Sequence, residues 1–396
     1  YPQHQKMATL SRNMLRVTVC FIRPANRCSF LGKRSLFSSE ILGIENFKRI
    51  SIFEKDKVLN KADFVDKLAH NRYATAFQDR RLVHDVVKLI YITEEESEVA
   101  LMTDLLRQLP CNRADAKEPS KDALNGRLNL EGPLSPRRFQ VGPLVFRLLH
   151  ILKDFHTAQM MYHDKELKPL FMNATCHLLL MDMLYEAGRY QEVVSSFTAL
   201  QLAQVSAKFP PDGTTLAMAA LYKLNTPTSS QEMERLIQEA KEADCRLSRR
   251  SLLFAAALAL RQRNAQCALD ISQTDSNSNE TIFRNIKMMA LAQFGRMEEA
   301  IIMMEEGLKE KLSTPTRTFT VYSDTAKAMS EQFTRRCQPP LETKFETIMT
   351  GLDEEGLLSP QTVEHFVNRP ILRQRRSQTS QSFKTRLKSP LKLRQK

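Results

Sequence analysis

Two stretches of the chain follow almost the same pattern: LMDMLYEAGRYQEV at residues 180–193 and KMMALAQFGRMEEA at residues 287–300. In each, an apolar helical segment ends at a Gly-Arg pair, and a second helical segment then opens with acidic residues. The glycines, Gly188 and Gly295, are 107 residues apart, which divides into three steps of about 36. Repeats of this length are typical of solenoids, in which a single unit cannot bury its apolar face alone. The sequence therefore predicts a repeated pair of helices.

The same period continues through the middle of the chain. Helical patterns alternate with short breaks from residue 76 onward, and no alternation typical of strands is evident. We expect early pairs at 78–92 with 96–109 and at 142–153 with 155–165, and a weaker last pair between Pro315 and Gly351. Turns between paired helices are predicted at residues 154, 188, 225, 264 and 295, where glycine or asparagine suits a left-handed helix end. The predicted fold is an all-α, right-handed superhelical solenoid of about 6–7 helix-turn-helix repeats.

Basic residues are concentrated at the two ends of the chain. The formal net charge is +13, but residues 1–39 hold seven Lys/Arg without an acid, and residues 371–396 hold nine without an acid. The part between them therefore has a charge of about −3. Overall basicity does not indicate that the folded part binds nucleic acid. The basic tail at 371–396 lacks an apolar period, so we expect it to be disordered and to act as an arm for nucleic acid or a ribosome surface.

The N-terminal segment has the composition of a mitochondrial presequence. Arg12, Arg16 and Arg23 alternate with apolar residues in an amphipathic pattern that Pro24 ends. We assign 1–38 to this presequence, with cleavage near Arg34–Ser38, and expect residues before Met7 to be translated leader. The predicted location is the mitochondrial matrix, and no stretch is long and apolar enough to span a membrane. An ordinary disordered basic tail is the alternative interpretation.

The remaining boundaries follow from composition. Residues 39–75 are assigned to a linker, 76–351 to the solenoid and 352–370 to a short C-terminal segment. Residues 110–138 hold four prolines, two glycines and many charges, so we expect an inserted, disordered loop there.

Signals for catalysis are absent from the sequence. No glycine-rich phosphate loop is present, and the seven cysteines show no CxxC pair. His150, His156 and His163 are spaced so that they do not share one helix face, and we interpret them as surface or packing residues. We predict no enzyme activity, no cofactor and no metal site.

The Gly-Arg turns carry a family resemblance. Ala187-Gly188-Arg189-Tyr190-Gln191-Glu192 and Gly295-Arg296-Met297-Glu298-Glu299-Ala300 resemble the signature turn of the pentatricopeptide repeat family. That resemblance implies a mitochondrial factor for RNA maturation, in which two or three side chains of each repeat read one base. By this resemblance, the two residues of a repeat that would contact one base are Leu178 with Asn173, Ala217 with Asp212, and Asn285 with Glu280. Leu178 and Ala217 cannot hydrogen-bond a base edge, so only Asn285 keeps an amide at that position.

A local cluster of arginines is the alternative route to RNA. It consists of Arg246, Arg249, Arg250, Arg261 and Arg263. Arginine matches phosphate bidentately, although an ordinary solvated helix face also explains such clusters.

Together these observations favour a non-catalytic factor that binds a mitochondrial messenger RNA or its precursor. It would support maturation, processing or stability of the transcript, and through it the respiratory chain, with RNA-processing or mitoribosome proteins as further partners. The alternative is a protein-binding solenoid, such as a mitoribosome-associated scaffold or an assembly factor. The near-neutral body and the apolar Leu178 and Ala217 favour that alternative.

Overall fold

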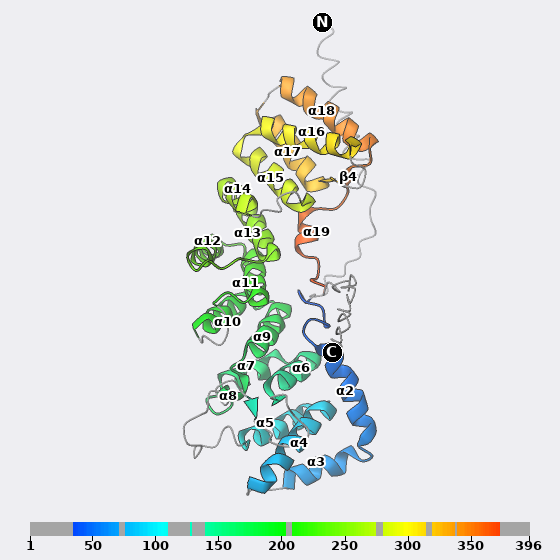
Figure 1. Cartoon of the computed structure of the whole chain (residues 1–396), viewed down its shortest axis with the longest axis vertical. Coiled ribbons are helices and arrows are strands. Elements are labelled where there is room, and N and C mark those ends of the chain that lie inside the picture. Colours follow the sequence, from blue (N-terminus) through cyan, green and yellow to red (C-terminus); the bar gives the residue numbers. More distant parts are fainter. Residues whose placement is uncertain are drawn as a thin grey trace, which may run out of the picture.

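Paired helices stack into an elongated array in the computed structural model (Figure 1). The structure describes residues 35–70, 76–109, 127–128, 139–202, 208–274, 280–313, 319–336 and 339–372. The helices that precede the regular pairs are α2 (Ile44–Lys57), α3 (Lys61–His70), α4 (Ala76–Ile92) and α5 (Glu96–Arg107). The repeated pairs are α6 (Gly142–Leu152) with α7 (Phe155–His163), α9 (Ala174–Glu186) with α10 (Tyr190–Leu202), α11 (Pro211–Leu224) with α12 (Pro227–Glu242), α13 (Arg249–Arg261) with α14 (Ala265–Thr274), and α15 (Thr281–Phe294) with α16 (Met297–Ser313).

The remaining elements are short or lie at the C-terminal end of the array. They are α8 (Lys168–Phe171), α17 (Ser323–Arg336), α18 (Pro339–Glu354) and α19 (Val363–Val367), with two-residue strands β1 (Arg127–Leu128), β2 (Phe139–Gln140), β3 (Val321–Tyr322) and β4 (Leu358–Ser359). Strand β1 pairs with β2 in antiparallel fashion, and β3 pairs with β4 in parallel. The predicted all-α solenoid is confirmed.

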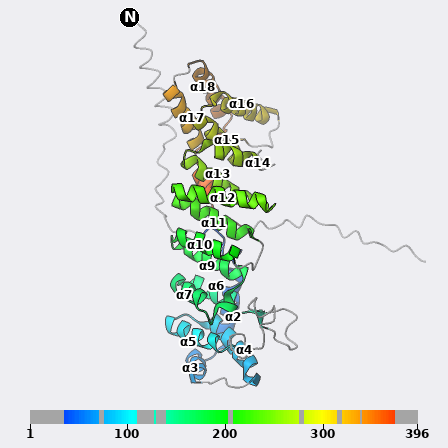
Figure 2. The same cartoon turned by 90° about the vertical axis from the view of Figure 1, so that its left-hand side faces the viewer.

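The array has two rows of helices. The first helices of the pairs (α6, α9, α11, α13 and α15) contact one another in sequence, and we call them the first-helix row. The second helices pack on the outside of this row, where α10 contacts α11 and α14 contacts α15. Figure 2 views the stack from the side of the second helices. The first-helix row contains the most continuous core: every residue from Gly213 to Tyr222 and from Ser251 to Leu260 is buried.

The turns within the pairs share a residue in the left-handed backbone conformation. Left-handed residues occur at Lys153 (φ 60°), Gly188 (φ 79°), Asn225 (φ 49°), Arg263 (φ 57°) and Gly295 (φ 94°). At four of these turns the N–H of the residue after the left-handed one donates to the carbonyl five residues earlier, as in Arg189 N to Leu184 O and Arg296 N to Leu291 O, both 2.9 Å. This is the Schellman arrangement, which satisfies carbonyls at the helix end and turns the chain sharply.

Residues 39–75, assigned to a linker from composition, hold α2 and α3. Helix α2 packs on α4 and α6, and its Phe47 ring lies 4.9 Å from the Tyr91 ring, centre to centre. Helix α2 is mostly polar and buries only Ile44 and Phe47, so its composition gave little indication of a packed helix. Most of 110–138, the expected inserted loop, lies outside the described residues, as do 1–34 and the tail from 373.

Both ends of the described chain return to the middle of the array. Phe37 forms a parallel β-bridge with Ile371, supported by Ser38 N to Ile371 O (3.1 Å) and Ile371 N to Leu36 O (2.8 Å). We call residues 35–43 together with 362–371 the terminal strap. Figure 1 shows α19 and the first described residues following one another along the same side of the first-helix row. Within the described residues, no helix is long and apolar enough to cross a membrane.

Candidate nucleic-acid interface

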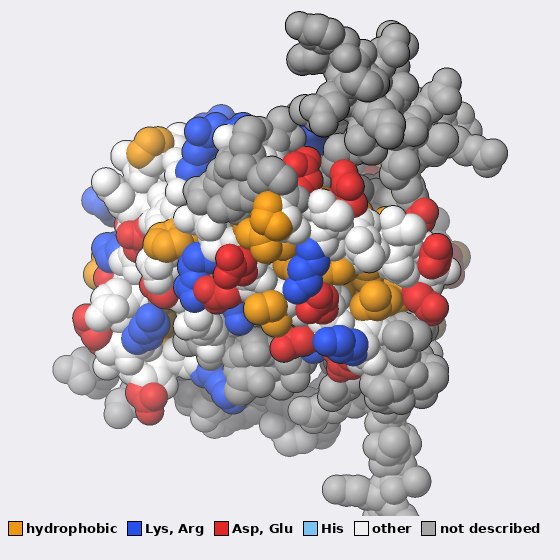
Figure 3. Space-filling model, turned by 90° about the horizontal axis from the view of Figure 1, so that it is seen from above, with side chains coloured by type: hydrophobic (Ala, Val, Ile, Leu, Met, Phe, Trp, Pro, Cys, Tyr) orange, Lys and Arg blue, Asp and Glu red, His pale blue; other side chains and the backbone are white. Residues whose placement is uncertain are grey.

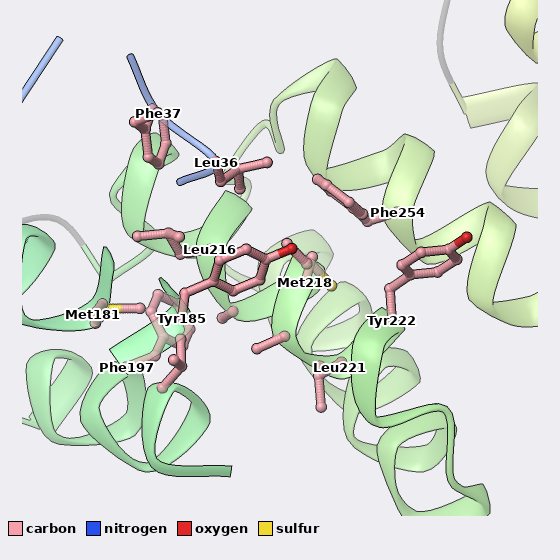
Figure 4. Packing of buried hydrophobic residues seen from close by; sticks show 14 of the residues in the cluster. Leu36, Phe37, Met181, Tyr185, Phe197, Leu216, Met218, Leu221, Tyr222 and Phe254 are labelled. Carbon is pink, nitrogen blue, oxygen red and sulfur yellow. The ribbon is translucent and has the colours of Figure 1, made fainter. Parts of the chain in front are cut away.

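The terminal strap covers the face of the first-helix row. Helix α19 packs on α13 and α15, and the strap residues Leu36, Phe37, Val363 and Val367 are at most 5% exposed. Figure 4 shows Leu36 and Phe37 within the same cluster of buried side chains as Tyr185, Leu216 and Phe254. An apolar face of this size is stable in water only when it is covered, and here the chain itself supplies the cover.

Arg250 fixes the C-terminal half of the strap. Its guanidinium donates to the carbonyls of Phe366 (2.8 Å), Val367 (2.6 Å) and Arg369, which lie at the end of α19. A cation at the C-terminus of a helix also complements the partial negative charge of its free carbonyls. Burial lowers the pKa of Arg250 to about 10.

Further contacts hold the strap on both sides of Arg250. Arg261 forms a 2.6 Å ion pair with Glu364 and lies over the ring of Tyr222. The Phe366 ring stacks on that of Tyr322 at 4.7 Å, and Arg147 Nε donates to Leu42 O at 2.9 Å. The strap is therefore an integral layer of the fold rather than a loose terminus.

Asn285, the amide expected to meet a base, lies in the core. Its side chain is 0% exposed, and its Nδ2 donates to the carbonyls of Thr281 (2.8 Å) and Thr320 (2.9 Å). Its Oδ1 accepts from Tyr322 N at 2.9 Å, so the amide joins α15 to β3. In this structure both polar atoms of the side-chain amide have hydrogen-bond partners within the protein, and a base cannot reach them. Its expected partner Glu280 is exposed at the start of α15 and forms an ion pair with Arg249.

Most residues of the other two expected pairs are also core or capping residues of their helices. Asn173 is buried and caps α9, where its Oδ1 accepts from Cys176 N at 2.9 Å, while Leu178 is partly buried. Ala217 is 0% exposed within α11, and Asp212 is exposed in the first turn of the same helix. Only Asp212 and Glu280 of the six residues face solvent. The sequence could not reveal the burial of Asn285, because its partners Thr320 and Tyr322 lie outside the repeat.

The five arginines do not form one cluster. Arg246, Arg249 and Arg250 lie at the N-terminal end of α13, and Arg261 and Arg263 lie at its C-terminal end, about 18 Å away for a helix of this length. Arg250 and Arg261 hold the strap, and Arg249 pairs with Glu280. Arg246 and Arg263 are exposed and have no ion-pair partner among the described residues. They are the members of the set that are free to meet a phosphate.

Exposed charges elsewhere are mixed in sign. Arg189 pairs with Glu192 and Arg296 pairs with Glu299, one turn further along the same helix. Figure 3 looks along the array onto the end formed by α16–α18, where basic and acidic side chains are interspersed with apolar ones. Exposed pairs of this kind contribute little to stability, and they leave the surface near neutral.

Several buried polar groups were not singled out by the sequence. Asp182 is 0% exposed; Ser35 Oγ donates to its two carboxylate oxygens at 3.0 and 2.9 Å, and His150 Nε2 lies 2.9 Å from Oδ2. One atom each from His150, Asp182 and Glu186 lie within 4.8 Å of one another, a set that could hold a metal ion. Glu186 is already paired with Lys153 at 2.5 Å, so these groups also satisfy one another without a metal.

A second buried pair joins α7 to α9. His177 is 0% exposed, with Nδ1 2.9 Å from Asn173 O and Nε2 against the Tyr162 hydroxyl. Burial lowers the pKa of His177 and raises that of Tyr162 to about 12. Because Nδ1 faces a carbonyl, it carries the proton, and the neutral ring accepts from Tyr162 at Nε2.

The fold thus defines a helical-repeat protein of the α-solenoid class, and comparison with known proteins agrees. The chain resembles the pentatricopeptide repeat-containing protein 2, mitochondrial, of several vertebrates. It is 22% identical to the Xenopus laevis protein over 341 residues, 86% of this chain and 83% of the relative. It is 23% identical to the Mus musculus protein over 343 residues, 85% of this chain and 82% of the relative, and 28% identical to the Homo sapiens protein over 226 residues, 57% of each. No known family profile matches the chain.

Proposed function

We propose that this protein is a mitochondrial factor that binds RNA without catalysing a reaction. In this proposal it supports maturation, processing or stability of a messenger RNA or its precursor, and so the respiratory chain. The observation that carries the proposal is the similarity to the mitochondrial pentatricopeptide repeat-containing protein 2, which extends over most of the chain and includes the helical pairs. RNA-processing and mitoribosome proteins are the further partners we expect.

Location in the matrix follows from the N-terminal segment in this proposal. Seven Lys/Arg without an acid in the first 39 residues favour import, and the relatives carry the word mitochondrial in their names. The basic residues beyond 372 would then add an electrostatic arm for RNA.

Contact with the RNA backbone, rather than base reading, is the mode that the site supports. The first-helix row is covered by the terminal strap, and Asn285 and Ala217 are buried. Exposed arginines remain at both ends of α13, with Arg246 and Arg249 at one end and Arg263 at the other. We propose that these side chains meet phosphates, for which the exposed ion pair of Arg249 with Glu280 can open at small cost.

In-cell crosslinking followed by sequencing of the bound RNA tests this function. We expect mitochondrial transcripts to be recovered from the crosslinked protein, and fewer of them when Arg246 and Arg263 are both changed to Glu. The control is Lys327→Glu on α17, which reverses the charge of one exposed side chain and is compared with each single arginine variant as well as with the pair. Recovery of no RNA above background from a protein that does enter mitochondria would exclude direct RNA binding.

A protein-binding role is the second candidate, and the strap itself favours it. Phe37 and Ile371 pair through their main chains beside an apolar helical face, and main-chain pairing of this kind is one way in which a protein binds an extended peptide. A scaffold of this kind would be recovered with mitoribosomal or assembly proteins, and its association would survive RNase treatment. Loss of all partners after RNase treatment would favour the RNA-binding function instead.

A further inference from the structure

Three side chains that can ligate a metal ion converge between the first two helices of the first-helix row. His150 lies in the last turn of α6, and Asp182 and Glu186 lie in the last two turns of α9, where a spacing of four residues puts both carboxylates on one helix face. One ligand atom from each residue lies within 4.8 Å of the other two, and His150 Nε2 is 2.9 Å from Asp182 Oδ2. Helices α6 and α9 pack directly on each other.

The burial of this set distinguishes it from an ordinary group of surface charges. Asp182 is 0% exposed, His150 is 5% exposed and the Glu186 side chain is 15% exposed. Acidic groups on a surface need no partner because water solvates them, whereas buried charges are paired or coordinate a metal. The set therefore offers a nitrogen and two carboxylates in a place from which bulk water is largely excluded.

Acceptor atoms outnumber hydrogens around Asp182. Its partners within the described chain are His150 and Ser35, and the Ser35 hydroxyl oxygen lies 3.0 and 2.9 Å from the two carboxylate oxygens and 2.8 Å from Phe37 O. A hydroxyl has one hydrogen, and the imidazole nitrogen supplies at most one more. Three oxygens therefore share the single hydroxyl hydrogen. A cation relieves such a surplus, because each ligand gives it an electron pair and needs no hydrogen.

We propose that His150, Asp182 and Glu186 bind a zinc ion that joins α6 to α9. Zinc takes imidazole nitrogen and carboxylate oxygen in a tetrahedral arrangement, with bonds of about 2.0–2.2 Å that separate the ligand atoms by about 3.3–3.6 Å. The separations in this set, from 2.9 Å to at most 4.8 Å, bracket that value, so small side-chain rotations bring the three atoms to one centre. Zinc binding here does not depend on RNA binding, and either can fail alone.

The ligand chemistry favours zinc over magnesium and calcium. Those two ions prefer oxygen ligands, and magnesium usually keeps several waters, for which a buried site has little room. Imidazole together with carboxylates suits zinc. A water takes the fourth position, and the Ser35 hydroxyl then donates to the second oxygen of Asp182 and orients that ligand from outside the metal site. Because Ser35 belongs to the terminal strap, the ion also supports the attachment of the strap to α9.

Lys153 competes with the metal for one ligand. Its Nζ lies 2.5 Å from Glu186 Oε2, and its side chain is 65% exposed. A solvent-exposed ammonium gains little from such a pair, so it turns out into water when a divalent ion takes the carboxylate. Removal of Lys153 should therefore strengthen zinc binding. Side chains that only hold the two helices together would give no such gain.

Zinc titration of the full-length protein tests the site. The purified chain is treated with a chelator, which is then removed, and is titrated with zinc in competition with a chromogenic zinc indicator. We expect one equivalent to bind, and Glu186→Gln and His150→Gln each to weaken binding by at least about tenfold, the loss that follows removal of even an outer-shell partner. Lys153→Ala should bind about two- to fivefold more tightly. The control is Glu299→Gln, which removes the carboxylate of an exposed ion pair with Arg296 and should leave binding unchanged.

Cobalt substitution separates this site from zinc binding by the seven cysteines. We expect the cobalt-loaded protein to show the visible absorption of a four-coordinate site without the charge-transfer band of a thiolate ligand. Circular dichroism verifies that each variant is folded, and if the two ligand variants do not fold, Lys153→Ala decides alone. A wild-type protein that binds no zinc, a thiolate cobalt spectrum, affinity unchanged in both folded ligand variants, or no gain in Lys153→Ala overturns the inference.

Discussion

Phe37 and Ile371 form a parallel β-bridge against the middle of the helical array. Two segments from opposite ends of the described chain thereby close one layer over the first-helix row. This layer changes how the repeats can act, because the face at which a helical-repeat protein would read bases is occupied by the protein itself. Any account of ligand binding has to place the ligand elsewhere or displace the strap.

Arg250 should control how firmly the C-terminal half of the strap is held. Arg250→Ala removes three hydrogen bonds from a charged donor to carbonyls, each worth about 1.5–3 kcal/mol. We expect hydrogen exchange of residues 363–371 to accelerate by at least about tenfold, which corresponds to about 1.4 kcal/mol. The matched control is Arg249→Ala, which removes an exposed ion pair with Glu280 and should leave that exchange unchanged. Unchanged exchange in Arg250→Ala would show that apolar burial alone holds the strap.

Asn285 should act as a structural residue. Asn285→Ala leaves the buried carbonyls of Thr281 and Thr320 and the N–H of Tyr322 without this partner, so we expect the free energy of unfolding to fall by about 2–4 kcal/mol. Urea denaturation followed by circular dichroism measures this change. Gln238→Ala on the exposed side of α12 is the control and should change stability by less than about 0.5 kcal/mol. A stable Asn285→Ala protein that has lost RNA affinity would instead restore the base-reading role.

The turns could be predicted from the sequence because their chemistry is local. Predicted positions 188, 225 and 295 coincide with left-handed residues, and predicted positions 154 and 264 are each one residue beyond Lys153 and Arg263. Lysine and arginine carry no turn signal, so at those two sites only the following Asp154 and Asn264 were informative.

The strap could not be predicted, for a physical reason. Its contacts join residues at opposite ends of the chain, as in Ser35 with Asp182 and Arg250 with Phe366. No spacing rule within a helix or a turn links such residues. Asn285 was misplaced for the same reason: its position in the repeat is as expected, but β3 packs on it from outside the repeat.

The Gly-Arg turns should be sensitive to a side chain at glycine. Gly188 has φ 79° with no neighbouring atom within 4 Å of an added Cβ, so the cost of Gly188→Ala comes from the backbone alone. We expect a loss of about 1–2 kcal/mol in the free energy of unfolding, and a similar loss for Gly295→Ala at φ 94°. Gly351→Ala within α18 is the control, since a helical alanine is favoured and the nearest atom is the end of the Leu308 side chain at 3.3 Å. An equal loss in the control would mean that packing, rather than φ, determines the cost.

Stability should fall at mildly acidic pH through His177. Burial lowers the pKa of this imidazole in the folded state, so the unfolded chain binds the proton more readily. The contribution of His177 to the free energy of unfolding is fully present at pH values above about 6.5, the pKa in the unfolded chain. It decreases as the pH falls below that value toward the pKa in the folded state. His177→Gln should lower stability at neutral pH but flatten its dependence between pH 5 and 7, measured by urea denaturation at each pH. His163→Gln, which changes an exposed histidine of α7, is expected to retain the wild-type slope.

The most direct test of the central claim, RNA contact through phosphates, is a salt titration of RNA affinity with the purified full-length protein. We expect the logarithm of affinity to fall linearly with the logarithm of salt concentration, and RNAs of equal length but permuted sequence to bind alike. Arg246→Glu and Arg263→Glu should each reduce the slope by about one, while Lys327→Glu should leave it unchanged. No affinity at low salt, or affinity that depends strongly on sequence and little on salt, would contradict the account.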